Sequence, residues 1–188
     1  MKKKLLMLSA VAICLAIFAA GSLAYFTSQD TAHNVITTGG VEIRLNEWAN
    51  TDRTEPFQDL EGMMPGVSVT KIAEVENTGT ADAWVRVLVK KNVTVKEQTE
   101  VAPSDDLITL DLNEKFWTLG NDGYLYYKDP LKPGETTEPI FTKVGFAPEM
   151  GNEFQGATVT VDVLAQAVQT AHNGATVMEA QGWPAANP

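Results

Sequence analysis

The chain has 188 residues, of which 44% are hydrophobic and 20% charged, a composition typical of a folded globular domain rather than of a disordered chain. Its formal net charge of −10 excludes the simple electrostatic mode of nucleic-acid binding, in which a basic face displaces counterions from phosphates. The same charge argues against docking on anionic lipid. We therefore expect no nucleic acid among its partners.

The N-terminal segment has the three parts of an export signal. Three lysines, Lys2 to Lys4, precede an apolar stretch from Leu5 to Ala20, and Ser22 and Ala24 then place small residues at −3 and −1 of a cleavage site. The apolar stretch is about as long as the shortest membrane span, so an uncleaved anchor is the alternative. We predict a signal peptide over residues 1–24, cleaved before Tyr25 by a signal peptidase, and no membrane attachment after cleavage.

Cleavage changes both the charge and the chemistry of the chain. It removes the three lysines and no acidic residue, which moves the formal net charge from −10 to −13, and it removes Cys14, the one cysteine. The mature chain therefore has no disulfide, no thiol nucleophile and no cysteine-ligated zinc or iron–sulfur site. Its stability must come from burial of apolar surface.

After the cleavage site, residues 25–39 are mostly polar and end in a pair of glycines. Their apolar points are Tyr25, Phe26, Val35 and Ile36. We predict a mobile N-terminal arm over 25–39, followed by a β-sandwich domain over 40–170 and a C-terminal tail over 171–188 that is frayed or loosely docked.

The dominant period of the mature chain is two, which predicts strands with one buried face. Alternation is clearest over four stretches: Val41 to Leu45, Val67 to Val75, Ala83 to Lys90 with a weaker continuation to residue 96, and Val159 to Ala167. Shorter candidates are Lys115 to Leu119, Tyr124 to Lys128 and Pro139 to Gly145.

Turn signals separate these stretches. Pro65-Gly66 and Pro133-Gly134 each precede a strand, and Asn121-Asp122-Gly123 between two aromatic-rich runs predicts a hairpin. Residues 99–111 are less regular and suit a loop or a short helix. About eight short strands at this spacing predict an all-β, antiparallel β-sandwich or jelly-roll-like single domain.

Catalytic and metal-binding patterns are weak. The two histidines, His33 and His172, belong to no zinc-binding helix motif, and the chain has no nucleophile elbow, P-loop or dinucleotide fingerprint. Acidic stretches that could hold calcium are Asp105-Asp106, Asp111-x-Asn113-Glu114 and Asn121-Asp122, but none has the spacing of a known calcium loop. We predict that the protein is not an enzyme and has no cofactor. We interpret the acidic stretches as solvated loops, and calcium binding at one of them is the alternative.

Aromatic residues gather between positions 116 and 127. Trp117, Tyr124 and Tyr126 could stack on sugar rings, but such residues more often form core and cross-strand pairs. In a strand, Tyr124 and Tyr126 share one face, opposite Leu125 and Tyr127.

Several short segments resemble the TasA/camelysin family of exported Gram-positive proteins, which a SipW-type signal peptidase processes. They are the junction Gly21-Ser22-Leu23-Ala24-Tyr25-Phe26-Thr27, the segments Pro65-Gly66, Asn77-Thr78-Gly79-Thr80 and Trp84-Val85-Arg86-Val87, and the closing Ala165-Gln166-Ala167-Val168-Gln169. The resemblance implies a jelly-roll-like fold and a place in the extracellular biofilm matrix or at the cell surface. It also implies fibres in which the N-terminal arm of one subunit adds a strand to the next.

Three functions follow from these observations. The leading interpretation is a secreted structural protein that polymerises with itself, and possibly with other matrix proteins, through donor strand residues Tyr25, Phe26, Val35 and Ile36. The alternative is a secreted binding module for a glycan or a surface partner. A camelysin-like metalloprotease is the remote third, because the sequence offers no set of zinc ligands.

Overall fold

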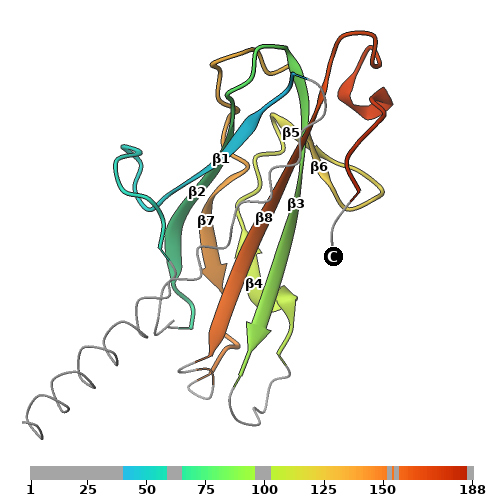
Figure 1. The fold of residues 1–188 in the computed structure, drawn as a ribbon. Coiled ribbons are helices and arrows are strands. Elements are labelled where there is room, and N and C mark those ends of the chain that lie inside the picture. The colour runs from blue at the N-terminus through green and yellow to red at the C-terminus, as the bar shows by residue number, and fades with distance from the viewer. Residues whose placement is uncertain (1–39, 59–64, 96–102, 152–153, 155–156, 186–188) are drawn as a thin grey trace, which may run out of the picture. The chain divides into compact units, whose positions relative to one another are not determined.

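A computed structural model describes residues 40–58, 65–95, 103–151, 154 and 157–185 of the chain (Figure 1). The predicted signal peptide, its cleavage site at Ser22, Ala24 and Tyr25, and the predicted arm over 25–39 lie outside the described residues.

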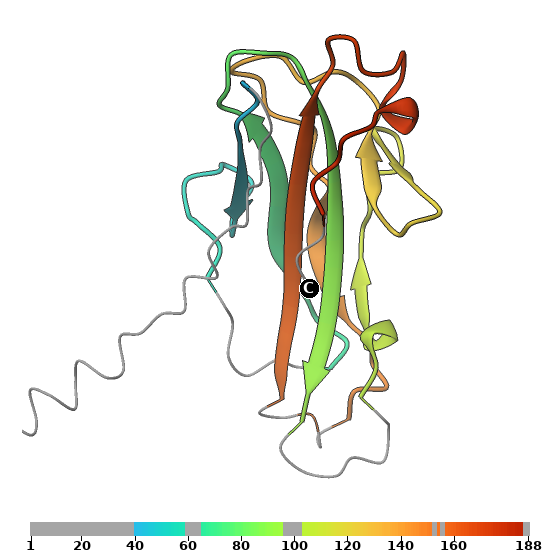
Figure 2. The ribbon, with the colours of Figure 1, turned by 45° about the vertical axis from the view of Figure 1, so that its right-hand side comes forward.

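Two four-stranded antiparallel sheets pack face to face as a sandwich (Figures 1 and 2). The first sheet has the order β1-β2-β7-β4, formed by β1 (Ile43–Trp48), β2 (Ser68–Asn77), β7 (Phe141–Phe146) and β4 (Ile108–Leu110). The second has the order β5-β6-β3-β8, formed by β5 (Trp117–Leu119), β6 (Leu125–Tyr127), β3 (Ala83–Thr94) and β8 (Thr158–Gln169). The 3-10 turns η1 (Asp105–Leu107) and η3 (Val177–Glu179) lie within the described ranges. The predicted all-β sandwich is confirmed.

The core lies between the sheets and follows from the period-two pattern. Val85 and Val87 of β3 are fully buried and face the first sheet, and Val75 and Phe141 meet them from β2 and β7. Leu125 and Tyr127 of β6 belong to this core, whereas Tyr126 of the same strand and Tyr124 just before it belong to a second cluster on the outer face of the sheet. Alternate residues of one strand therefore fill two different apolar layers.

The predicted turns form as their residues require. Gly66 and Gly134 have φ of 71° and 77°, which a glycine after a proline accepts without strain. In the β5–β6 hairpin, Gly123 has φ of 82°, and the Gly120 amide donates to the Tyr124 carbonyl at 2.7 Å. Each of these signals was local, so the sequence alone could place the turns.

The segment Asn77 to Thr80 is a packed corner of the sandwich. The fully buried Asn77 side chain donates to the carbonyl oxygens of Ala81 and Leu131 at 2.9 and 2.8 Å. A Cβ at Gly79 would lie 2.6 Å from the Glu42 amide nitrogen, so only glycine fits. The Asn-x-Gly motif of this corner thus has a structural explanation.

Residues 103–111 are partly as predicted, whereas residues 99–102 of the same predicted segment lie outside the described chain. Ser104 caps the short turn η1 by accepting from the Asp106 amide at 3.2 Å, and the chain then forms β4, which pairs with β7. The sequence did not indicate β4, because three residues are too few to show a period.

The C-terminal tail is docked in its described part, which differs from the frayed or loosely docked tail expected from the sequence. It lies over the outer face of the second sheet, where the Trp84 indole N–H donates to the Asn173 carbonyl at 2.9 Å. Val177 and Ala180 are buried against Tyr126 and its neighbours. The aromatic outer face of this sheet needs such a cover, because exposure of its rings to water is unfavourable.

Candidate functional site

Among the described strands, β8 is the outermost strand of the second sheet, and one side of its backbone is open. It pairs with β3 in one unbroken register along its whole length. The Thr170 amide continues this ladder by donating to the Asp82 carbonyl at 3.0 Å, so even-numbered residues of β8 direct their N–H and C=O groups toward β3. The backbone groups of the odd-numbered residues therefore point away from the sheet: Val159, Val161, Val163, Ala165 and Ala167.

The same odd-numbered residues direct their side chains into the sandwich. Ala165 and Ala167 are buried, whereas Val159, Val161 and Val163 are only half-buried although they pack against the core. Val69 of β2 and Val89 of β3 are also half-buried neighbours of the core. The apolar layer between the sheets is thus incompletely covered along the first half of β8.

On the same side of the sandwich, β1 is the outermost strand of the first sheet and lies against β8 (Figure 1). The Thr78 amide donates to the Glu42 carbonyl at 2.8 Å, so the odd-numbered residues of β1 direct their backbone groups outward. At the end of β1, the Glu47 carbonyl accepts from the Phe57 amide at 2.9 Å. The following loop therefore covers the end of β1, while β8 has no such cover in the described chain.

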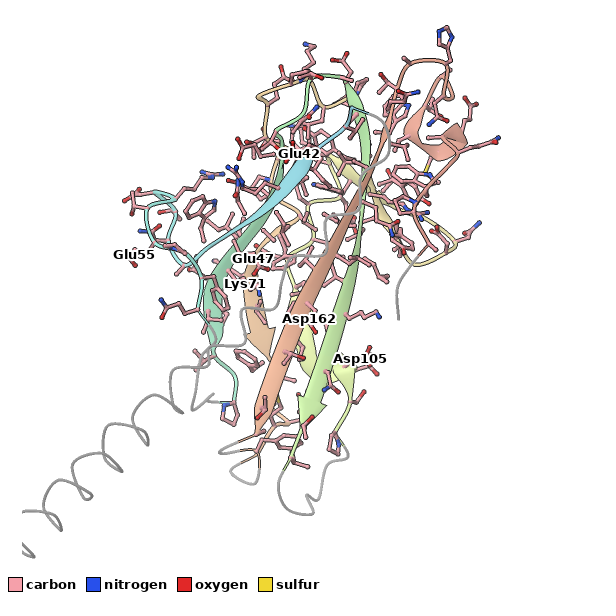
Figure 3. All side chains as sticks on the ribbon, in the orientation of Figure 1. Glu42, Glu47, Glu55, Lys71, Asp105 and Asp162 are labelled. Carbon is pink, nitrogen blue, oxygen red and sulfur yellow. The ribbon has the colours of Figure 1, made fainter. Side chains whose placement is uncertain are left out.

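An ion pair between β1 and β2 of the first sheet lies at this edge, and its lysine also reaches the second sheet. The Lys71 ammonium group lies 3.0 Å from a carboxylate oxygen of Glu47, and the two side chains are 7% and 18% exposed (Figure 3). Lys71 also donates to the Val161 carbonyl of β8 at 3.0 Å and lies 4.5 Å from the centre of the Phe57 ring. Lys71 sits at a bulge of β2, where the register with β7 shifts by one residue between Thr70 and Ala73.

The three aromatic residues predicted as possible ligand-stacking groups are buried and do not share one surface. Trp117 is 2% exposed and lies between the sheets, where its indole N–H donates to the Glu138 carbonyl at 3.0 Å. Tyr124 and Tyr126 lie on the opposite face and are each 7% exposed. Stacking on a sugar would require the C-terminal tail to leave this face.

Arg86 organises the outer aromatic cluster. Its guanidinium carbon lies 3.9 Å from the centre of the Tyr124 ring and 4.6 Å from that of Trp183, and its Nε donates to Gln166 Oε1 at 2.9 Å. These contacts hold a cation between aromatic faces. They also fill the space in which a ligand cation could have bound.

Asp122 completes this cluster by accepting hydrogen bonds. The Tyr126 hydroxyl donates to Asp122 at 2.7 Å, and Arg86 lies 3.2 Å away. Burial alone would raise the pKa of Asp122, but the bonds from the Tyr126 hydroxyl and the Tyr124 amide and the charge of Arg86 lower it overall. Burial and the bond to Asp122 raise the pKa of Tyr126. The carboxylate predicted as a calcium candidate at Asn121-Asp122 is thus used within the protein.

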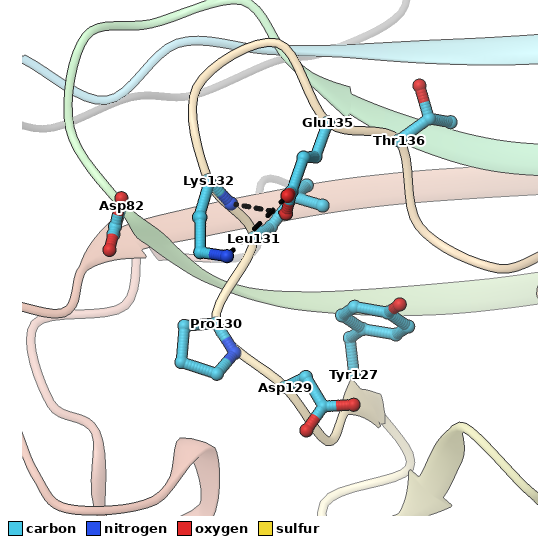
Figure 4. Close-up of a pocket in the computed structure, with 8 residues that line it drawn as sticks. All are labelled: Asp82, Tyr127, Asp129, Pro130, Leu131, Lys132, Glu135 and Thr136. Atoms are coloured by element: carbon cyan, nitrogen blue, oxygen red, sulfur yellow. Dashed lines mark hydrogen bonds and ion pairs between the residues drawn. The ribbon is translucent and has the colours of Figure 1, made fainter.

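An open pocket of about 500 Å³ lies beside the loop between β6 and β7 (Figure 4). The carboxylates of Asp82, Asp129 and Glu135 line it, and Glu135 forms an ion pair with Lys132 at 3.7 Å. Burial raises the pKa of Tyr127, which also lines the pocket. Among the described hydrogen bonds of its lining residues, none joins a nucleophile to a base.

The described residues do not fit a metal centre. In these ranges, no three His, Cys, Asp or Glu residues lie close enough together to hold a metal ion. His172 is exposed in a turn, with φ of 58°, and His33 lies outside the described chain. Of the other calcium candidates, Asp111 accepts from Thr142 and Lys143, and Asp106 packs against the Ser104 cap.

Sequence reasoning missed Lys71 and Glu47 as a pair. One signal was available: Lys71 occupies the parity of Val69, Ala73 and Val75 and thus interrupts the buried face of β2 with a charge. The parity alone could not show that Lys71 reaches β8, because that contact depends on how the two sheets pack.

No helix within the described ranges is long and apolar enough to cross a membrane. No curated protein and no solved structure is significantly similar to the chain. A family model described as Camelysin metallo-endopeptidase matches residues 1–122, which extend from the N-terminal segment to the β5–β6 hairpin. The match spans more than half of the chain, and the protein therefore belongs to the camelysin family, the TasA/camelysin family that its sequence motifs resemble.

Proposed function

We propose that this protein is an exported structural subunit of the extracellular matrix that polymerises by donor-strand addition at the β8 edge. The observation that carries the proposal is that β8 has both an open backbone edge and an incompletely covered apolar layer beside it. Apart from the Val161 carbonyl, which accepts from Lys71, the outward backbone groups of its odd-numbered residues have no bonding partner in the described chain, and the side chains of Val159, Val161 and Val163 leave the adjoining core half-covered. An added strand would satisfy both deficits at once.

The proposed donor is the N-terminal arm of a second copy, with Tyr25, Phe26, Val35 and Ile36 as its apolar points. An extended peptide forms main-chain hydrogen bonds with a sheet edge and places alternate side chains against the core. Because the arm of each subunit fills the edge of the next, the contact is head-to-tail and generates a filament unless it closes into a ring.

Cleavage of the signal peptide would control this assembly. The arm directly follows the predicted cleavage site at Ala24, so before cleavage it is tethered to the signal segment. Release of Tyr25 frees the arm to reach another subunit. The protein would then assemble outside the cell and not during export.

The description of the matched family names a metallo-endopeptidase, but the described residues fit no catalytic metal centre. We derive no hydrolytic step from this structure. In the aromatic cluster, Arg86 and Trp183 cover the rings of Tyr124 and Tyr126, which are therefore not available to stack on a glycan.

The test compares two purified chains by negative-stain electron microscopy at moderate salt, one starting at Tyr25 and one starting at Gly39. Every described strand follows Gly39, so the shorter chain keeps the complete sandwich. We expect filaments from the longer chain only. Filaments from both chains would refute the role of the arm, and monomers from both would refute self-assembly of the pure protein.

A further inference from the structure

We propose that Lys71 and Glu47 form a latch that holds the β8 edge closed in the free subunit and must open before a strand can be added there. This inference rests on the proposed function, because it concerns the regulation of the same edge. The Val161 carbonyl oxygen points outward from β8 and accepts a hydrogen bond from the Lys71 ammonium group at 3.0 Å.

An added strand opposite Val161 needs that oxygen as an acceptor for its own backbone N–H. It must also place its backbone beside β8, in the region that the Lys71 side chain crosses on its way from β2 to β8. The ammonium group therefore competes with the strand for both an acceptor and space. Strand addition must break the Lys71 contact with Val161.

The surroundings of Lys71 keep it in the closed position. Glu47 accepts from it at 3.0 Å, and the Phe57 ring lies 4.5 Å from its nitrogen. Phe57 is itself held by the bond from its amide to the Glu47 carbonyl. The cation is thus bound on three sides by groups from β1, the following loop and β8.

Stability alone gives little reason to retain such a pair. A largely buried ion pair costs desolvation of both charges, and apolar residues of similar volume often serve equally well. An inward-pointing charge near a sheet edge has a different advantage, because it opposes uncontrolled pairing with other strands. At this edge the pair would delay assembly until a donor of sufficient affinity displaces Lys71.

The test uses the mature chain from Tyr25 with both charges removed, Lys71→Met together with Glu47→Gln. The matched control is Arg44→Met with Glu76→Gln, which removes an exposed ion pair within the first sheet and leaves the net charge equally unchanged. Fibre growth is followed by light scattering. We expect the lag of the latch variant to shorten about tenfold, the factor expected for losing one charge-assisted hydrogen bond from the barrier, and the control to match the wild type.

An unchanged or longer lag in the latch variant would overturn the latch. If the double variant does not fold, as thermal unfolding would reveal, Lys71→Arg replaces it. Arginine keeps the cation and its donors, so the wild-type lag or a longer one is expected, and a shortened lag would overturn the proposal.

A second readout separates the latch from the proposed function. A fluorescent peptide with the sequence of residues 25–39 is added to the wild-type mature chain and to the latch variant, and fluorescence polarisation reports binding. Faster association with the variant supports the latch. No binding to either chain, together with no fibres, would refute donor-strand addition itself, whereas equal binding to both would refute only the latch.

Discussion

At the scale of single residues, Asp111 shows how one carboxylate fixes a strand pair. It follows β4 directly and accepts from the backbone amides of Thr142 and Lys143 in β7 at 2.8 and 2.6 Å, as well as from the Thr142 hydroxyl. Burial would raise the pKa of Asp111, but these three donors outweigh it and lower the pKa below its usual value. The residue that the sequence offered as a calcium candidate therefore acts as a cap for the β4–β7 ladder.

We expect Asp111→Ala to lower the free energy of unfolding by about 1–2 kcal/mol at neutral pH, because two backbone amides and a hydroxyl lose their acceptor. A carboxyl group whose pKa is depressed in the folded state stabilises the protein above its unfolded pKa of about 3.9. This contribution disappears as the pH falls through the lower folded pKa. Thermal unfolding of both chains at pH 7 and at about pH 3 checks the prediction, and a difference independent of pH would contradict it.

At the scale of elements, the backbone N–H and C=O groups of β8 point in two opposite directions. Even-numbered residues hold it to β3, and odd-numbered residues face outward. The two sets can be altered separately, because a proline removes one N–H and is tolerated at an edge where that N–H faces away from the ladder.

We therefore expect Val163→Pro to abolish or strongly slow fibre growth while the subunit stays folded. Val163→Ala is the matched control, because it trims the same half-buried side chain but keeps the outward N–H. Circular dichroism reports folding and electron microscopy reports fibres. Normal fibres from the folded proline variant would show that the added strand does not pair with this part of β8.

The sequence could predict the elements whose signals are local, but not the contacts between residues far apart in the chain. The alternation of valines predicted β3 and β8, and the glycine turns predicted the β5–β6 hairpin, since both signals are local. The docking of the tail depends on Trp183 meeting Arg86 and Tyr126 across the sheet, a contact between residues far apart in the chain. For the same reason, the parity of Lys71 was readable in the sequence but its contact with Val161 was not.

At the scale of the whole molecule, charge opposes assembly. Cleavage of the predicted signal peptide would remove three lysines and move the formal net charge from −10 to −13, so that mature subunits would repel one another. The range of that repulsion falls as salt is added, because the Debye length shrinks from about 30 Å at 0.01 M to about 10 Å at 0.1 M.

We expect fibre growth of the mature chain to accelerate as sodium chloride rises from about 0.01 to 0.1 M, as the screening length falls. Mild acidification should act in the same direction, because protonation of carboxylates reduces the negative charge. Light scattering measures both titrations, with sucrose as an uncharged control for the salt series. Growth that does not change in either titration would contradict this prediction.

The pairing of β3 with β8 also determines when the protein can fold. The second sheet joins Ala83–Thr94 to Thr158–Gln169, the last of the described strands, so its longest ladder closes a large loop. Contacts this distant in sequence form slowly, because the entropy of loop closure must be overcome first. In a chain that crosses a membrane N-terminus first, as the proposed export requires, β3 lacks its partner until Thr158–Gln169 has followed. Late closure of this sheet would keep the chain unfolded, and so able to pass through a channel, during the proposed export.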